Sequence, residues 1–371
     1  MSPLTYLIVG SGWRAEFYGR IAAAYPGLFR AVYYCRSEEK AALMRARTGA
    51  YAFTSKEACL TMNPDFVVTA VDKAHCADVA IEWARRGFAV ACETPAAPSI
   101  EGLKALWDSQ GRFSENPEPS PENPGIVPAS SKITCMEQYH RYPILMAGLA
   151  AIDSGAIGEP YSAYLSVAHD YHGFSLIKKM LKTEGQGYTI RGQKIKSPVI
   201  MTDSRNSALY DGALKTADRD ILHITFDSGK TAVYDFSGTQ YHSFIRSRSL
   251  IVRGSRGEWN GRTILGLTPE NEPTRTALMP DIPARYRCLD NTALRDLRKV
   301  WQNELTLETA QDEFAIASML LDMREFIAGG PSPYPLISAL EDSLFWLRAQ
   351  EALSSPWTEV RVPPASEVFQ R

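Results

Sequence analysis

Short apolar runs and amphipathic segments alternate along the first hundred residues of the chain. The apolar runs, which are typical of buried strands, lie at residues 4–10, 29–35, 65–71 and 88–92. Segments with a helical pattern lie at residues 13–25, 37–48 and 74–86. Apolar strands separated by helices are typical of βαβ units, in which helices cover both faces of a parallel sheet. The N-terminal part is therefore predicted to be an α/β domain with a parallel sheet.

The pattern differs in the second half of the chain. Further strands are predicted at residues 133–138, 160–168, 221–226, 231–236 and 249–254. Helices are predicted at residues 143–154, 174–182, 305–327 and 335–352. Alternating runs joined by Gly-containing turns such as Asp227-Ser228-Gly229 are typical of antiparallel strands. We therefore expect a second, α+β domain with a largely antiparallel, open sheet.

A Pro-rich segment at residues 109–131 separates the two patterns. It is rich in Pro, Ser, Glu and Asn and has few apolar side chains to bury, so we expect an exposed loop. Such a loop is either a tolerated surface insertion or a lid or partner-binding element. The domain boundary is placed at its end, which gives a first domain at residues 1–132 and a second at residues 133–371.

Composition and charge limit the classes of partner. A length of 371 residues suits two domains, and 40 Lys and Arg against 42 Asp and Glu leave a net charge of -2. No basic excess indicates nucleic acid. No stretch approaches the ~18 apolar residues of a membrane span, and the N-terminus lacks the pattern of a signal peptide. The six cysteines form no CxxC pair, so buried free thiols in a cytoplasmic protein are expected.

A glycine turn follows the first predicted strand and opens a helix. The segment Gly10-Ser11-Gly12-Trp13-Arg14-Ala15 has the pattern GxGxxA. The first Gly permits a tight turn, the second lets the backbone approach a pyrophosphate, and the small third residue permits helix–strand packing. The free N–H groups of the helix end favour phosphate. Residues 10–14 are therefore predicted to bind NAD or NADP.

The end of the second predicted strand bears on the choice between these two cofactors. An Asp or Glu usually binds the adenosine ribose there, but this chain has Cys35-Arg36-Ser37. Arg36 next to Ser37 suits a 2′-phosphate, which favours NADP slightly. The alternative is an Arg that faces solvent at a turn.

Several segments, in this order, resemble the Gfo/Idh/MocA family, named after glucose–fructose oxidoreductase and inositol dehydrogenase. They are the glycine turn, residues 65–71 followed by His75, the segment Cys92-Glu93-Thr94-Pro95, residues 138–143, and residues 155–159. The Glu93-Thr94-Pro95 segment stands where the family has Glu-Lys-Pro. The resemblance covers most of the chain and thins after about Gly266.

The resemblance implies a fold and a chemistry. It implies a Rossmann domain followed by a substrate domain whose open sheet mediates oligomerisation, as a homodimer or homotetramer. It implies NAD(P)-dependent oxidation of a secondary alcohol of a sugar or cyclitol, or reduction of the ketone, with substrate held between the domains. His75, Glu93 and Thr94 would lie at the cofactor.

The chain departs from the family at two positions. Thr94 replaces the Lys that polarises the substrate hydroxyl, and a Thr hydroxyl carries no charge to stabilise an alkoxide. Ala168 stands four residues before His172, where the family has an Asp that works with the His. Two alternatives stay open beside the oxidoreductase, the first from the resemblance itself and the second from these departures. One is a redox-neutral, glycosidase-type enzyme with a retained cofactor, and the other is a non-catalytic nucleotide-binding protein.

A cluster of ionisable residues stands at this second position, in the segment His169-Asp170-Tyr171-His172. Histidine suits the role of base because its pKa of ~6.5 lies near working pH. We expect His172 to be the base, with His169, Asp170 or Tyr171 orienting it. Successive strand residues point to opposite faces, so the chain must turn for all four to meet. The alternative is an N-cap region with a buried, satisfied His.

Three further residues are expected at the substrate. Tyr139 and Arg141 begin the second domain, where the family's residues line the cleft, and His242 is expected on the predicted sheet of the second domain. Arg141 alternatively forms a structural salt bridge. No metal is expected, because Asp170 is the only carboxylate near the two histidines and no third ligand stands at a suitable spacing.

Overall fold

The computed structural model describes residues 2–111, 132–204, 208–241, 243–279, 282–289 and 311–369. The chain divides into two compact units, each built from separate stretches of sequence. The first unit comprises the described residues of 1–141, 284–297 and 312–343. The second comprises those of 142–283, 298–311 and 344–371. Most of the predicted 109–131 loop and residues 305–310 of a predicted helix lie outside the described residues.

A parallel sheet of six strands forms the centre of the first unit. The strands are β1 (Leu4–Val9), β2 (Phe29–Tyr34), β3 (Tyr51–Phe53), β4 (Phe66–Thr69), β5 (Val90–Cys92) and β6 (Ile133–Cys135). Their order is β3-β2-β1-β4-β5-β6, and every pair is parallel. The order reverses between β1 and β4, and ligands of such sheets bind at the carboxyl ends of the strands at this point. The predicted α/β domain with a parallel sheet is confirmed.

The helices of the first unit are α1 (Trp13–Ala24), α2 (Glu38–Thr48), α3 (Lys56–Leu60), α4 (Cys76–Arg85) and α5 (Ile100–Gly111), with the 3-10 turn η1 (Lys73–His75) before α4. Three of them, α1, α2 and α4, follow the predicted segments, whereas α3 and α5 were not predicted, and α5 extends over residues 109–111 of the predicted loop. Local signals fix their ends. Ser37 caps α2 by accepting a hydrogen bond from the backbone N–H of Lys40, and Gly49 ends it in the left-handed conformation at φ 71°.

Later segments of the chain complete this unit. They are η2 (Tyr139–Arg141), η4 (Ala284–Leu289), α8 (Gln311–Ile327) and the start of α9 (Leu336–Ser354). An ion pair of 2.7 Å joins Arg20 on α1 to Glu313 on α8. The Thr134 hydroxyl donates to the carbonyl of Tyr334 at 2.8 Å and ties β6 to the segment before α9. Residues 133–138, expected to begin the second domain, thus supply the edge strand of the first sheet.

A mixed sheet of nine strands forms the second unit. Its order is β14-β13-β12-β11-β7-β10-β9-β8-β15, and only β7 and β10 pair in parallel. The strands are β7 (Pro160–Ser166), β8 (Tyr188–Ile200), β9 (Leu214–Phe226), β10 (Thr231–Phe236), β11 (Ser249–Gly254), β12 (Gly257–Asn260), β13 (Thr263–Leu267), β14 (Pro273–Ala277) and β15 (Val360–Val362). The expectation of a largely antiparallel sheet is confirmed.

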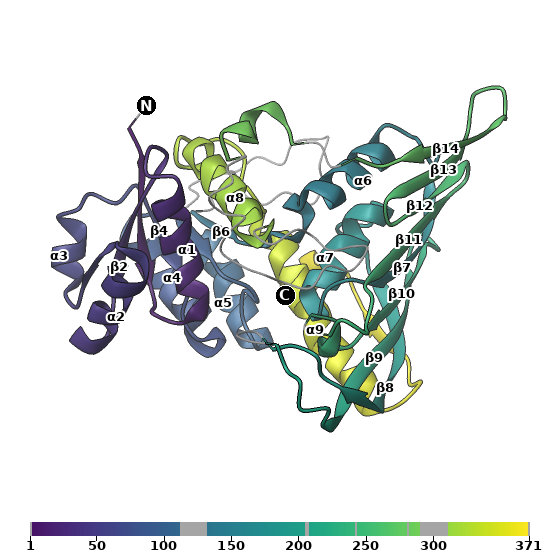
Figure 1. Cartoon of the computed structure of the whole chain (residues 1–371), viewed down its shortest axis with the longest axis horizontal. Coiled ribbons are helices and arrows are strands. Elements are labelled where there is room, and N and C mark those ends of the chain that lie inside the picture. Colours follow the sequence, from purple (N-terminus) through teal and green to yellow (C-terminus); the bar gives the residue numbers. More distant parts are fainter. Residues whose placement is uncertain are drawn as a thin grey trace. The chain divides into compact units, whose positions relative to one another are not determined.

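Helices cover one face of this sheet (Figure 1). They are α6 (Pro143–Asp153), α7 (Asp170–Leu181) and the later part of α9, and a short helix, α10 (Ala365–Phe369), ends the described chain. Phe174 on α7 stacks on Phe345 of α9 with ring centroids 4.1 Å apart. Gly148 lets α6 approach the sheet, because a Cβ there would lie 2.0 Å from the ring of Trp259. Large aromatic side chains therefore form the core between helices and sheet.

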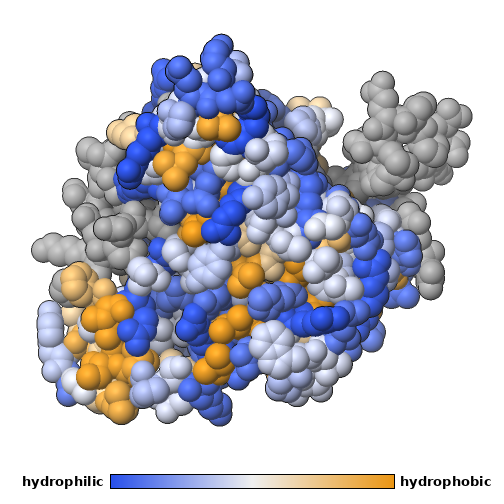
Figure 2. Space-filling view, turned by 90° about the vertical axis from the view of Figure 1, so that its right-hand side faces the viewer, coloured by the Kyte–Doolittle hydropathy of each residue, from blue (hydrophilic) through white to orange (hydrophobic). Residues whose placement is uncertain are grey.

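The opposite face of the nine-stranded sheet carries no helix of the described chain. Buried residues alternate with more exposed ones in the first part of β8 and the last part of β9, as expected where one face of a sheet is covered. In the space-filling view of Figure 2, hydrophilic residues predominate and are interrupted by several hydrophobic patches. Within the described ranges, no helix has the length and apolar character needed to cross a membrane.

Candidate functional site

The predicted glycine turn lies at the carboxyl end of β1, where the strand order of the first sheet reverses. Gly10 has φ +135°, and a Cβ at this position would lie 2.1 Å from the carbonyl oxygen of Ala70 after β4. A Cβ at Gly12 would meet nothing within 4 Å. The backbone at Gly10 therefore packs directly against the residue that follows β4, whereas the space beside Gly12 is open. Such a surface fits the close approach of a pyrophosphate to the start of α1.

Three other residues of this turn differ in their exposure to solvent. Ala15 is fully buried, as the packing role of the third position of the pattern requires. Trp13 is 52% exposed, and Ser11 is partly exposed between the two glycines. His75 is also exposed and ends η1, which directly follows β4. Carboxyl ends of neighbouring parallel strands share one edge, so His75 lies at the same edge of the sheet as the glycine turn.

Arg36 and Ser37 follow the end of β2 and differ in whether their side chains are available to a bound nucleotide. The Ser37 hydroxyl accepts the backbone N–H of Lys40 at 3.3 Å, so it serves the start of α2. The Arg36 side chain is exposed, and Cys35 before it is buried. An exposed guanidinium at this edge is available to a charged group of a bound nucleotide.

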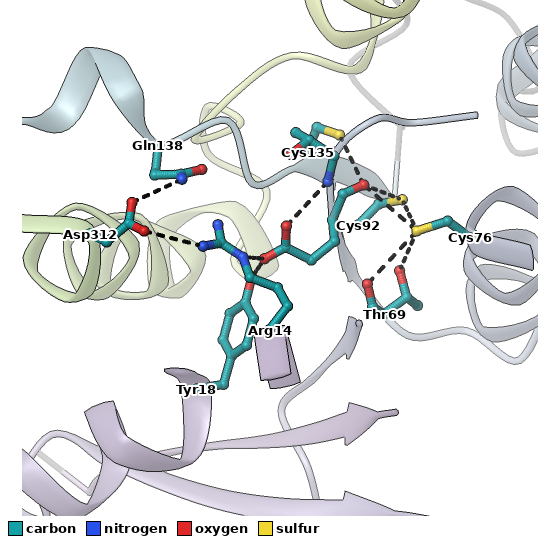
Figure 3. A network of polar contacts seen from close by, with 10 residues as sticks. Arg14, Tyr18, Thr69, Cys76, Cys92, Cys135, Gln138 and Asp312 are labelled. Carbon is teal, nitrogen blue, oxygen red and sulfur yellow. Dashed lines mark hydrogen bonds and ion pairs between the residues drawn. The ribbon is translucent and has the colours of Figure 1, made fainter. Parts of the chain in front are cut away.

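Arg14 lies inside a buried polar network and holds Glu93 (Figure 3). The Arg14 Nε–H donates to Glu93 Oε1 at 2.7 Å, and its Nη1 lies 3.6 Å from Asp312 Oδ2 on α8. Tyr18 also donates to Glu93. Burial opposes the charge of Arg14, but the two carboxylates outweigh it and raise the pKa of the guanidinium. Arg14, predicted as a cofactor contact, is thus engaged with two acids of its own chain.

This network positions the segment that stands in place of Glu-Lys-Pro. The second carboxylate oxygen of Glu93 accepts the backbone N–H of Thr94 at 3.2 Å, and the Thr94–Pro95 peptide bond is cis. Gln138 donates to Asp312 at 3.1 Å and extends the network to η2. Both carboxylate oxygens of Glu93 are therefore engaged, one by Arg14 and Tyr18 and the other by the backbone N–H of Thr94. In this way Glu93 orients the backbone of Thr94 after the end of β5.

Three thiols lie close to the same segment, one at the start of α4 and two at the ends of β5 and β6. Cys76, Cys92 and Cys135 are buried, and their sulfur atoms lie 3.6, 3.5 and 3.9 Å from the carbonyl oxygen of Glu93. Cys76 Sγ and Cys92 Sγ are 3.4 Å apart (Figure 3). Contacts between the thiols and burial raise the pKa of Cys76 and Cys92. These groups are protonated donors at neutral pH, not nucleophiles.

A thiol titration tests this environment. We expect a colorimetric thiol reagent at pH 8 to label one thiol per folded chain within minutes and all six after denaturation in guanidinium chloride. Cys288 is the exposed cysteine, whereas burial raises the pKa of Cys59 to about 11 and keeps Cys35 covered. A Cys288→Ser variant should show no fast phase. Fast labelling of a second thiol would contradict the described packing.

Tyr139 and Arg141, predicted as substrate contacts, lie in the first unit. Tyr139 is buried. Arg141 Nη2 lies 2.9 Å from Asp322 Oδ2 on α8, and its Nη1 donates to Tyr286, whose hydroxyl in turn donates to Asp322 at 2.7 Å. The guanidinium of Arg141 is therefore held by a salt bridge between η2 and α8.

The segment His169-Asp170-Tyr171-His172 forms a compact cluster in the second unit. Asp170 has φ +42°, so the chain turns where the strand ends and α7 begins. The turn brings three rings together, with centroids 4.8 Å apart for His169 and His172 and 4.5 Å apart for Tyr171 and His172. His172 is buried, and His169 and Tyr171 are partly exposed. The structure thus places these four residues at one turn.

Two tyrosines from elsewhere in the second unit fix this cluster. The Tyr241 hydroxyl accepts the backbone N–H of His169 at 3.0 Å and lies 2.7 Å from Nδ1 of its ring. The Tyr234 hydroxyl accepts the backbone N–H of Asp170 at 2.8 Å. The sequence had indicated His242, which lies outside the described residues, and missed its neighbour Tyr241. No local signal distinguishes the two, because the contact joins segments 72 residues apart.

No group of three His, Cys, Asp or Glu side chains in the described ranges is arranged to hold a metal ion. His169 contacts His172, Tyr171 and Tyr241, and His172 also contacts Tyr171. The cluster has the components of a proton-transfer site, since an imidazole with a hydrogen-bonded phenol can accept and release a proton near neutral pH.

The order of the six parallel strands and the glycine turn at their reversal point define the first unit as a dinucleotide-binding Rossmann domain. Residues 4–112 match the model of the Gfo/Idh/MocA family, described as an oxidoreductase family with an NAD-binding Rossmann fold. Residues 4–112 are thus similar to the NAD-binding domain of the Gfo/Idh/MocA oxidoreductases, and the resemblance drawn from the sequence is confirmed over this part of the chain.

Solved structures are similar to the chain over nearly its whole length. An oxidoreductase from Agrobacterium radiobacter, in complex with NAD+, L-tartaric acid and magnesium, is 14% identical with a TM-score of 0.65, covering 97% of this chain and 98% of that chain. Levoglucosan dehydrogenase, in complex with NADH and levoglucosan, is 16% identical with a TM-score of 0.65, covering 98% and 100%. An NAD-binding oxidoreductase from Klebsiella pneumoniae is 16% identical with a TM-score of 0.66, covering 97% and 99%. At these identities the likeness concerns the fold. No curated protein matches the chain in sequence.

Proposed function

We propose that the chain is an NAD(P)-dependent oxidoreductase that acts on a secondary alcohol or ketone of a sugar, glycoside or cyclitol. The observation that carries the proposal is the glycine turn, closed against Ala70 at Gly10 and open at Gly12, within a segment that matches an NAD-binding family. A structure of the same fold is levoglucosan dehydrogenase with its sugar bound, which supports the substrate class. Assembly as a homodimer or homotetramer is part of the same proposal.

The residues of the first unit would hold the nucleotide. The open backbone at Gly12 and the start of α1 would face the pyrophosphate, and Thr94, oriented by Glu93, would lie at the nicotinamide end. The nicotinamide, when bound, supplies the hydride acceptor or donor. Arg14 stays with Glu93 and Asp312 and would act on the cofactor only by holding this segment in place.

The histidine cluster would move the proton. Oxidation of an alcohol needs a base that takes the hydroxyl proton as the carbon loses hydride, and we assign this role to His172. His169, Asp170 and Tyr171 would orient its ring, with Tyr241 and Tyr234 fixing the backbone of the turn. Thr94 would donate a neutral hydrogen bond where the family has a charged Lys. We therefore expect slower turnover than an ammonium group would allow, because the developing oxyanion is less stabilised.

The first experiment is a calorimetric titration of the purified chain with NAD+, NADH, NADP+ and NADPH, followed by a screen of sugar and cyclitol alcohols. Micromolar binding of one cofactor and turnover of an alcohol would support the proposal. A cofactor that copurifies and is never exchanged, with no net reduction of added NAD(P)+, would instead favour a redox-neutral enzyme. Folded, empty protein that binds none of the four would reject the oxidoreductase.

Arg36 is the proposed determinant of NADP binding. We expect Arg36→Ala to weaken NADPH binding about tenfold and to leave NADH binding within twofold, because a charge-assisted hydrogen bond to the 2′-phosphate is lost. Arg30, also exposed but at the opposite end of β2, provides the matched control as Arg30→Ala. Equal effects of Arg36→Ala on both cofactors, measured by calorimetry, would reject the NADP preference.

A further inference from the structure

Arg248 differs from several other cations of the second unit in its lack of an acidic partner. Arg219, for example, forms an ion pair with Asp235. Within the described ranges, no carboxylate forms an ion pair with Arg248. Its Nε–H donates to the carbonyl of Gln240 at 3.4 Å, and its guanidinium lies over the ring of Tyr241. The two terminal nitrogens, Nη1 and Nη2, are therefore available to a ligand.

Arg248 lies on the helix-covered face of the nine-stranded sheet. It directly precedes β11, in which Leu250 and Val252 are buried. Val252 is directly opposite Trp259, whose ring packs against α6 at Gly148, so these alternate residues of β11 face the helices. Arg248 stands two residues before Leu250 and continues this series. Its guanidinium is therefore not part of the face that carries no helix.

Tyr241 joins Arg248 to the histidine cluster. The guanidinium carbon of Arg248 lies 4.8 Å from the centroid of the Tyr241 ring. The hydroxyl of this tyrosine lies 2.7 Å from Nδ1 of His169. The rings of His169 and His172 have centroids 4.8 Å apart. A group bound at Arg248 would thus be linked through two side chains to the ring of the proposed base.

The loop that carries Arg248 is fixed to the end of β7. The side-chain amide of Gln240 donates to Ser166 Oγ at 2.9 Å and to the carbonyl of Ser247 at 2.7 Å. β7 and β11 are neighbours in the sheet, and His169 follows the end of β7 by three residues. The arginine and the histidine cluster therefore extend from adjacent strand ends, and hydrogen bonds hold the loop between them.

The shape and charge of this guanidinium limit the chemistry of a ligand. Nη1 and Nη2 form a planar fork that matches the two oxygens of a carboxylate. The neighbouring Arg246 donates from Nη1 to the carbonyl of Ile245 at 2.9 Å, so it is engaged with its own loop. A phosphate monoester carries nearly two negative charges at neutral pH and calls for more than one cation. One available guanidinium therefore fits a carboxylate better.

We propose that Arg248 is a specificity-determining residue that selects substrates with a carboxylate group, such as uronates and aldonates, over neutral sugars and cyclitols. The inference rests on the proposed oxidoreductase and narrows its substrate class. The carboxylate accepts two hydrogen bonds from Arg248, and the secondary alcohol of the same molecule lies toward His172. Tyr241, which contacts both Arg248 and His169, holds the two parts of the site at a fixed separation.

Ligand-observed NMR on the whole chain tests this selection with matched pairs of ligands. D-glucuronate is compared with D-glucose, D-galacturonate with D-galactose, and D-gluconate with D-glucitol, since each pair differs in a carboxylate against a hydroxymethyl group. We expect at least one acid to bind about tenfold more tightly than its neutral partner, because charge-assisted hydrogen bonds are strong. Arg248→Gln should remove this preference. Arg248→Lys, which keeps the charge but not the fork, should retain part of it.

Two further measurements separate selection from damage to the fold. Arg275, exposed on the edge strand β14, is the matched control, and Arg275→Gln should keep the preference for the acid. With the acid as substrate, Arg248→Gln should raise KM more than it lowers kcat, because the lost interaction holds the substrate equally before and during the reaction. A merely structural role of Arg248 would lower the binding of both members of a pair alike.

Three outcomes would overturn the inference. The first is no saturation transfer to any of the three acids. The second is equal affinity for both members of every pair, or a preference that Arg248→Gln leaves unchanged. The third is tighter binding of D-glucose 6-phosphate than of any acid, which would indicate a phosphate site.

Failure of this inference is distinguishable from failure of the proposed function. A chain that binds NAD(P) and oxidises neutral alcohols alone would reject the carboxylate and keep the oxidoreductase. A chain that binds the acids through Arg248 but binds none of the four cofactors would reject the oxidoreductase and keep the carboxylate site.

Discussion

Replacing Gly10 by Ala is expected to destabilise the first unit by about 3–5 kcal/mol, whereas the same change at Gly12 should leave stability nearly unchanged. The Cβ at Gly10 would lie 2.1 Å from a backbone oxygen, and φ +135° is unfavourable for any side chain. Gly12 has φ -83°, with open space around a Cβ. In thermal unfolding, Gly10→Ala should lower Tm by about 10 °C, and Gly12→Ala by at most a few degrees.

Cofactor titration separates the two glycines in a second way. We expect Gly12→Ala to fold and to bind NAD(P) at least about tenfold more weakly, because its Cβ occupies the surface that a pyrophosphate would approach. A Gly12→Ala variant with unchanged cofactor affinity would show that the turn does not bind the nucleotide. A Gly10→Ala variant as stable as the unaltered chain would contradict the close approach of β4 to the turn.

His172→Asn is expected to lower kcat by about 10³-fold without changing cofactor affinity, because a general base contributes about 10²–10⁴-fold. Asn keeps a polar side chain of similar volume in a buried position but cannot accept a proton at neutral pH. The assay uses the alcohol with the highest turnover in the screen. His169→Asn should have a smaller effect and shift the pH profile, since His169 acts through its neighbours.

The interpretation of these kinetics depends on two controls. Circular dichroism melts should show that His172→Asn is folded, since His172 packs against His169 and Tyr171. Calorimetry should show an unchanged cofactor dissociation constant. Turnover within threefold of the unaltered chain would reject His172 as the base. If both cofactor binding and turnover are lost, the substitution disrupts more than proton transfer.

Local patterns predicted most elements of the fold. The apolar runs at residues 29–35, 231–236 and 249–254 correspond to β2, β10 and β11, because uniform or alternating apolarity follows directly from burial of one or both faces. The three-residue strand β3 and the long strand β8 were missed. β3 is too short to show a repeating pattern of apolar residues. The polar, exposed half of β8 has a sequence that resembles a loop.

Contacts between distant segments could not be predicted. Residues 133–138 have the pattern of a strand, but only the pairing with β5 shows that they belong to the first sheet. Arg14 was interpreted as a cofactor contact because it follows the glycine turn, whereas its partner Glu93 is 79 residues away. Arg141 is likewise held by Asp322 on α8. The partner of such an ion pair lies far away in the sequence, so the local pattern around an arginine does not show which acid it contacts.

The discontinuous make-up of the first unit has a consequence for synthesis on the ribosome. The six parallel strands are complete once residue 135 has been made, but α8 and the segment that ties down β6 emerge almost two hundred residues later. Until then Arg14 has only Glu93 of its two carboxylate partners, and Arg20 lacks Glu313. A nascent or truncated chain ending near residue 141 should therefore be prone to proteolysis and in need of chaperones.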